Sequence, residues 1–132
     1  MSWGSAADAR PPSLAGKRRR TRRARCIGRS MPTVIDARTA SDHFPGIGRY
    51  VVNLCRALGR VAPDLDLVVL HDPSATTSRL TLPNVPRLAC PTSPFALRQQ
   101  WLVPRQLRRA GARLYHSPYY LMPYWPGVPT VL

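Results

Sequence analysis

The two glycines at positions 46 and 48 are the residues best suited to contact a charged ligand. They follow a short apolar run and open a stretch with helical periodicity. Glycines at such a junction let the backbone approach a ligand closely, and the free amides of a helix start favour an anion such as a diphosphate. Gly46, Ile47, Gly48 and Arg49 therefore form a candidate diphosphate-binding segment. Turn formation explains the glycines equally well, and Arg49 is as readily a solvated side chain.

Polar side chains also follow two apolar runs elsewhere in the chain. Asp36 and Arg38 end the first run, where the Asp can fix the loop by accepting backbone amides or can meet a ligand hydroxyl; the structural role is favoured. His116 and Ser117 end a later run. Adjacent strand residues point to opposite faces, so these two are not a nucleophile and its base. His116 is either a polar contact at a cleft rim or a half-buried histidine bonded to backbone.

Aromatic residues gather in a loop framed by prolines, at Tyr119, Tyr120, Tyr124 and Trp125. Such rings stack on sugars and apolar groups, and they also serve as packing anchors of a loop. Both interpretations stay open for this loop.

The acidic residues and cysteines offer little chemistry of their own. The chain has no Glu, and no two of its six Asp residues are placed by a motif to act together, so we assign no catalytic residue. The three cysteines, Cys26, Cys55 and Cys90, lack the spacing of a metal site and are expected to be reduced, mostly buried thiols. We expect no metal and no cofactor.

The charge of the chain is concentrated at one end. The 132 residues carry 20 Lys and Arg against six Asp, and nine of the basic residues lie in residues 1–30 beside a single acid, Asp8. We expect residues 1–30 to be a disordered basic extension, a candidate for peripheral contact with an anionic membrane or another polyanion. No apolar stretch approaches the ~20 residues of a membrane span, and a cytoplasmic protein is expected.

Periodicity predicts two helices. Residues 46–60 place Tyr50, Leu54 and Leu58 on one apolar stripe, accompanied by Val51, Cys55 and Val61. Residues 97–110 are expected to be helical, kinked or restarted at Pro104, and capped by Gly111. In this second helix the predicted apolar face consists of Leu97, Trp101, Leu107 and Ala110.

Short apolar runs predict five strands, over residues 33–37, 65–70, 87–90, 113–116 and 128–132. Their alternation with the helices predicts an α/β fold, a Rossmann-like and mostly parallel sheet with helices on both faces. Ligands of such sheets gather at the carboxyl ends of the strands. The loops 38–48, 71–74 and 116–127 all lie there.

Several of these segments, taken in order, resemble a known family. The runs 34–38, 46–54, 115–120 and 128–131 resemble the N-terminal domain (subfamily 4-like) of group 1 glycosyltransferases of the GT-B type, most of all mannosyltransferase-like members. The resemblance spans about residues 32–132. It implies retaining transfer of a hexose such as mannose, from a UDP- or GDP-sugar to a glycan or lipid-linked acceptor, without an obligatory metal.

The resemblance also implies roles for single residues. The segment Gly46 to Arg49 would face the donor diphosphate and sugar. The acceptor side of the cleft would include Asp36, Arg38, His116, Ser117, Tyr119 and Tyr120. The family's Thr-x-His-Asp motif and its glutamate pair are missing from this chain, so we expect residues 31–132 to be a partial N-terminal domain without turnover of its own.

Two alternatives compete with this interpretation. A small basic module could contact nucleic acid or acidic surfaces through residues 10–29. An NAD-binding domain is disfavoured, because Val51 replaces the third glycine of the fingerprint, and Asp64 and Asp66 precede or begin the second strand instead of ending it.

Overall fold

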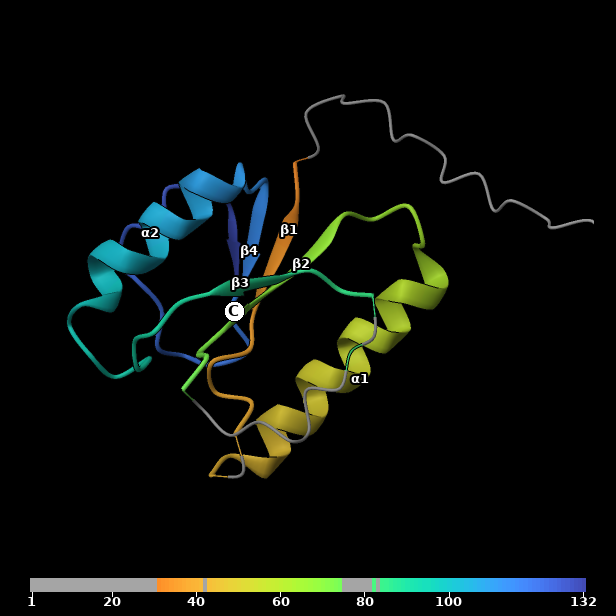
Figure 1. The fold of residues 1–132 in the computed structure, drawn as a ribbon, viewed down its shortest axis with the longest axis horizontal. Helices are drawn as coiled ribbons and strands as arrows, with labels where there is room; N and C mark the ends of the chain where they lie inside the picture. The colour runs from red at the N-terminus through yellow and green to blue at the C-terminus, as the bar shows by residue number, and fades with distance from the viewer. Residues whose placement is uncertain (1–30, 42, 75–81, 83) are drawn as a thin grey trace, which may run out of the picture.

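The computed structural model describes residues 31–41, 43–74, 82 and 84–132 (Figure 1). The predicted basic extension, residues 1–30, lies outside the described residues.

Five parallel strands form one sheet in the order β3-β2-β1-β4-β5. The strands are β1 (Thr33–Asp36), β2 (Leu67–His71), β3 (Arg87–Ala89), β4 (Leu114–His116) and β5 (Thr130–Val131). In the centre of the sheet, Val34 lies beside Val68 on one side and Tyr115 on the other. The predicted α/β Rossmann-like fold is confirmed, and the strand order reverses between β1 and β4, where such folds bind ligands.

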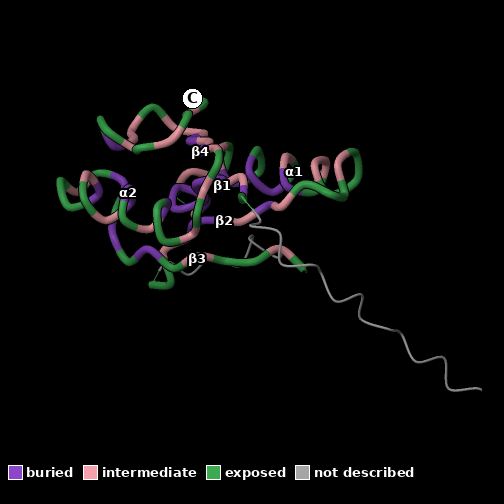
Figure 2. The backbone as a smooth tube through the Cα atoms, turned by 90° about the horizontal axis from the view of Figure 1, so that it is seen from above, coloured by how far each residue is buried: buried purple, intermediate pink, exposed green. Residues whose placement is uncertain are grey.

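Helix α1 (Pro45–Val61) covers one face of the sheet, as Figure 2 shows from above. Val51, Val52 and Cys55 are buried against Ile35 and Val69 of the strands. The predicted stripe was partly wrong, because Tyr50 is 48% exposed and Val61 is 78% exposed. The helix is rotated so that the line through residues 48, 51, 52 and 55 meets the sheet.

Helix α2 (Gln99–Ala110) covers the opposite face, with Val103 and Leu107 packed on the core residue Tyr115. The predicted face of this helix was wrong at its start, since Leu97 and Trp101 are 79% and 71% exposed. The helix instead buries Gln99, Val103 and Leu107, which follow one another at intervals of four residues. This is possible because the buried Gln99 amide has polar partners, so that a Gln can take a position that the pattern reserved for an apolar residue.

The second helix runs without interruption through Pro104, which is buried. Pro104 removes one intrahelical hydrogen bond but does not restart the helix. Gly111 ends the helix in the left-handed conformation, with φ 65°, and its amide returns to Arg108. The predicted glycine cap is confirmed.

Cys55 and Cys90 are buried free thiols, and burial raises the pKa of Cys55 to about 11. Among the described residues, no helix has the length and apolar character needed to cross a membrane.

Candidate functional site

The first turn of α1 lies at the carboxyl end of the sheet, below the strand ends in Figure 1. The helix begins at Pro45, so the two glycines lie inside its first turn and not in the loop before it. The first helical hydrogen bond runs from the Gly48 amide to the Phe44 carbonyl, at 3.0 Å. Phe44 supplies no side-chain cap. The amides of Gly46 and Ile47 therefore have no partner within the helix and are available to an anion.

The two glycines differ in their surroundings. A Cβ on Gly46 would have nothing within 4 Å, whereas a Cβ on Gly48 would meet the Ala40 backbone at 3.6 Å. Gly48 is buried against the β1–α1 loop, and Gly46 is exposed. Gly46 is thus the glycine whose missing side chain leaves the approach to the helix start open.

His116, at the end of β4, faces this turn. Its Nε2 lies 3.2 Å from the Tyr50 hydroxyl of α1, and its Nδ1 lies 3.3 Å from the Val131 carbonyl oxygen. A carbonyl can only accept, so Nδ1 donates and Nε2 of the singly protonated ring accepts from Tyr50. The ring contact of Tyr50 and His116, with centroids 6.0 Å apart, fixes both side chains.

A pocket of about 280 Å³ opens between the first turns of α1 and the end of β4. Its lining residues come from both elements and from the end of the chain: Gly46, Ile47, Tyr50, His116, Pro118 and Leu132. An apolar groove of about 300 Å³ shares Tyr50 and His116 with it and continues along α1 past Leu54 and Leu58. A third cavity, of about 360 Å³, lies at the amino ends of β2 and β3 and shares Leu58 and Leu65 with the groove.

Asp36 and Arg38 form a buried ion pair and do not line this pocket. Arg38 Nη2 is 2.7 Å from Asp36 Oδ2, and the two side chains are 0% and 5% exposed. Arg38 Nε and the Arg38 backbone amide both donate to Asp36 Oδ1 at 3.0 Å. All of these bonds turn the two side chains toward each other. Asp36 and Arg38 therefore hold the β1–α1 loop and are not presented to a ligand.

The ion pair extends into a network that reaches β4, the loop after β3 and the start of α2. The Tyr115 hydroxyl donates to Asp36, and Arg38 reaches the Gln99 side chain at 3.2 Å and the Thr92 carbonyl at 3.4 Å. Burial and the Asp36 charge raise the pKa of Tyr115 above its usual range. Burial alone would lower the pKa of Arg38, but the hydrogen bond and charge of Asp36 outweigh it and raise that pKa.

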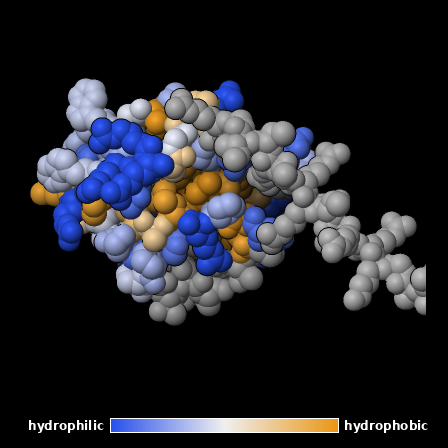
Figure 3. All heavy atoms as spheres, turned by 45° about the horizontal axis from the view of Figure 1, so that its top comes forward, coloured by the Kyte–Doolittle hydropathy of each residue, from blue (hydrophilic) through white to orange (hydrophobic). Residues whose placement is uncertain are grey.

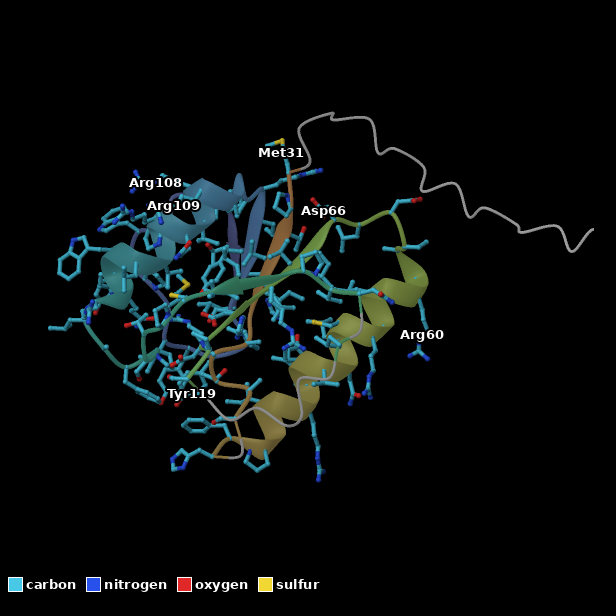
Figure 4. All side chains as sticks on the ribbon, in the orientation of Figure 1. Met31, Arg60, Asp66, Arg108, Arg109 and Tyr119 are labelled. Atoms are coloured by element: carbon cyan, nitrogen blue, oxygen red, sulfur yellow. The ribbon has the colours of Figure 1, made fainter. Side chains whose placement is uncertain are left out.

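An aromatic cluster lies at the same end of the sheet. Phe44, Phe95 and Tyr119 come from the loops after β1, β3 and β4, and their ring centroids are 5.7 to 6.1 Å apart. Figure 4 shows Tyr119 at the end of the sheet where α1 begins. Tyr120 continues the cluster, with its hydroxyl 2.9 Å from that of Tyr119, and it is 73% exposed. These rings form an apolar surface next to the glycine turn.

The predicted site residues thus do not form one site. Gly46, Ile47 and His116 line one pocket, while Tyr119 and Tyr120 belong to the aromatic cluster. Arg49 is exposed on α1. Ser117 is 1% exposed, and its hydroxyl donates to the Tyr119 carbonyl, so it shapes the turn. Among the described residues, no group of three His, Cys, Asp or Glu side chains could hold a metal ion.

Sequence reasoning missed Tyr50, Phe44, Phe95 and Gln99 as members of the site. Tyr50 was assigned to the buried stripe of its helix, although its hydroxyl is what meets His116. Phe44 and Phe95 each adjoin a proline in a loop that follows a strand, which is the signal that could have found them. Gln99 carried no signal, because its partners are distant in sequence.

Comparisons with known proteins do not assign this site to a family. No protein-family model matches the chain, and the searches of curated proteins and of solved structures found no significant match.

Proposed function

We propose that this chain forms part of the N-terminal domain of a retaining nucleotide-sugar glycosyltransferase, and that it has no turnover by itself. The observation that carries the proposal is the pocket between the first turn of α1 and His116. Uncapped amides of a helix start suit a diphosphate, and the pocket lies at the carboxyl ends of the strands, where Rossmann-like sheets bind nucleotides. The resemblance of the runs 46–54 and 115–120 supports the same assignment.

In this proposal the Gly46 and Ile47 amides face the donor diphosphate, with Arg49 as a flanking cation. His116, held by Tyr50 and the Val131 carbonyl, offers a polar contact on the acceptor side of the cleft. Tyr119 and Tyr120 provide a stacking surface for an acceptor, because flat aromatic rings suit the apolar face of a sugar. Asp36 and Arg38 hold the loop that positions these groups.

Stabilisation of the leaving diphosphate is the main task of such an enzyme, and it requires fixed donors around the developing charge. The described residues contribute two backbone amides and one exposed arginine on one side. Transfer is therefore assigned to a longer relative in which a second domain completes the cleft, and weak donor binding is the activity to measure here.

The test is a titration of the full chain with GDP-mannose and with UDP-glucose, followed by ¹H–¹⁵N NMR. We expect shifts of the Gly46, Ile47 and His116 amides, and competition by inorganic pyrophosphate. Gly46→Ala should weaken binding about tenfold, because its Cβ enters the open approach to the amides. Gly59→Ala is the matched control, since it lies in the same helix and its Cβ also meets nothing within 4 Å.

Equal effects of the two glycine substitutions would contradict the proposal, as would shifts confined to other regions. Anion binding that depends on salt alone, with no effect of Gly46→Ala, would favour the basic-module alternative.

A further inference from the structure

The side of the molecule formed by α2 has an unusual combination of charge and exposed apolar residues. Residues 73–132 contain seven Arg and not one Asp or Glu. Arg98, Arg105, Arg108 and Arg109 are exposed on α2 or directly before it. Figure 3 shows hydrophilic side chains gathered on the side where α2 lies, and Figure 4 places Arg108 and Arg109 there, away from Arg60 on α1.

Large apolar side chains project from the same side. Leu97 and Trp101 are 79% and 71% exposed, and Tyr124 and Trp125 of the β4–β5 loop are 81% and 86% exposed. The Tyr124 amide donates to the Gln100 side chain at 2.8 Å, which ties this loop to the first turn of α2. The exposed rings of helix and loop therefore belong to one surface.

The spacing on α2 explains the arrangement. Trp101, Arg105 and Arg108 follow one another at intervals of four and three residues, which is a single stripe of α2, and Leu97 lies in the turn just before the helix. The opposite stripe, which includes Val103 and Leu107, is buried on the sheet. The outer stripe thus presents apolar side chains at its start and guanidinium groups toward its end.

We propose that the outer face of α2, with the adjoining tip of the β4–β5 loop, binds the surface of an anionic lipid membrane. Tryptophan and tyrosine lie at the headgroup level of bilayers, and a helix with Arg and Trp on its exposed face lies in that interface. Residues 73–132, which contain no Asp or Glu, supply the positive charge that complements the anionic headgroups. Arginines and aromatic rings also suit a nucleic acid, but Leu97, 79% exposed, has no ring to stack on a base and gains instead from burial in the lipid interface, which favours the membrane.

The proposal does not rest on the proposed function, because it requires neither a nucleotide-sugar nor turnover. It is tested by co-sedimentation of the full chain with phosphatidylcholine vesicles, with and without phosphatidylglycerol. Arg105→Gln/Arg109→Gln should lower the partition coefficient about 30-fold on the anionic vesicles. Arg56→Gln/Arg60→Gln is the matched control, an exposed pair at the same spacing on α1, and should lower it less than about threefold. Residues 1–30 are the same in all three chains.

A second pair of variants tests the apolar contribution. Trp101→Ala should weaken binding about tenfold, and Val61→Ala, at a 78% exposed position of α1, should leave it unchanged. In a Trp3→Phe background, anionic vesicles should shift the emission of the two remaining tryptophans to shorter wavelength.

Three results would overturn the proposal. The first is an equal loss from both arginine pairs, which would mean attraction by net charge alone. The second is equal binding to vesicles with and without phosphatidylglycerol, or no binding to either kind of vesicle. The third is an α2 variant that loses affinity for an oligonucleotide but keeps its affinity for anionic vesicles.

Discussion

Replacement of Arg38 by Met removes the cation that pairs with the buried Asp36 carboxylate. The wild-type guanidinium donates to both Asp36 oxygens, at 2.7 to 3.1 Å, and its side chain is fully buried. In Arg38→Met, Asp36 keeps only the Tyr115 hydroxyl and the residue-38 amide as partners. Breaking a buried pair by removing one partner costs ~3–5 kcal/mol. That is a large share of the roughly 5–15 kcal/mol that stabilises a typical domain.

The second substitution makes the prediction specific. Asp36→Asn alone leaves a buried guanidinium without its counter-charge and should destabilise by a similar amount. Added to Arg38→Met, however, it should restore about 2 kcal/mol, because a neutral amide can still accept from Tyr115 without a stranded charge. Asp36→Asn should thus destabilise the chain when residue 38 is Arg and stabilise it when residue 38 is Met.

Urea unfolding of the four chains, followed by far-UV circular dichroism, measures both effects. With a slope of ~1–3 kcal/mol per M, the midpoint of Arg38→Met should fall by at least about 1 M. Arg49→Met, an exposed arginine on α1, is the control and should change stability by less than about 0.5 kcal/mol. A loss below about 1 kcal/mol for Arg38→Met, or further destabilisation by the added Asp36→Asn, would refute the reasoning.

Three further predictions concern stability. Burial raises the pKa of Cys55 from 9.0 to about 11, so its thiolate forms at lower pH in the unfolded chain than in the folded one. The free energy of unfolding should therefore fall as the pH rises from 9 to 11. In thermal melts, Cys55→Ala should flatten that part of the profile of stability against pH. Leu107→Ala should cost ~2–5 kcal/mol while Leu97→Ala costs less than about 0.5 kcal/mol, and similar values in urea would mean that the face of α2 is misassigned. Gly111→Ala should destabilise by about 1 kcal/mol, since Gly111 has φ 65°, and an unchanged melting temperature would argue against that cap.

The local pattern of the sequence was sufficient for the elements. Apolar runs such as residues 33–36 predicted the strands, and the glycine at 111 marked the end of a helix, because both features depend on the backbone and its nearest neighbours. The alternation of strands and helices then predicted the parallel sheet, since crossovers of that kind leave few topologies open.

The tertiary structure alone decided which face of each helix is buried and which residues form the site. Periodicity placed Trp101 inward, but the buried bonds of Gln99 to Arg38 and to the Pro94 carbonyl turn α2 the other way. Gln99 and Arg38 are 61 residues apart in the chain. Such contacts carry no local signal, because the free energy of a buried hydrogen bond depends on a partner that only the folded chain brings near. The sequence by itself therefore determined the strands, the helices and their parallel arrangement. Only the fold decided which helix faces are buried and which side chains meet at the site.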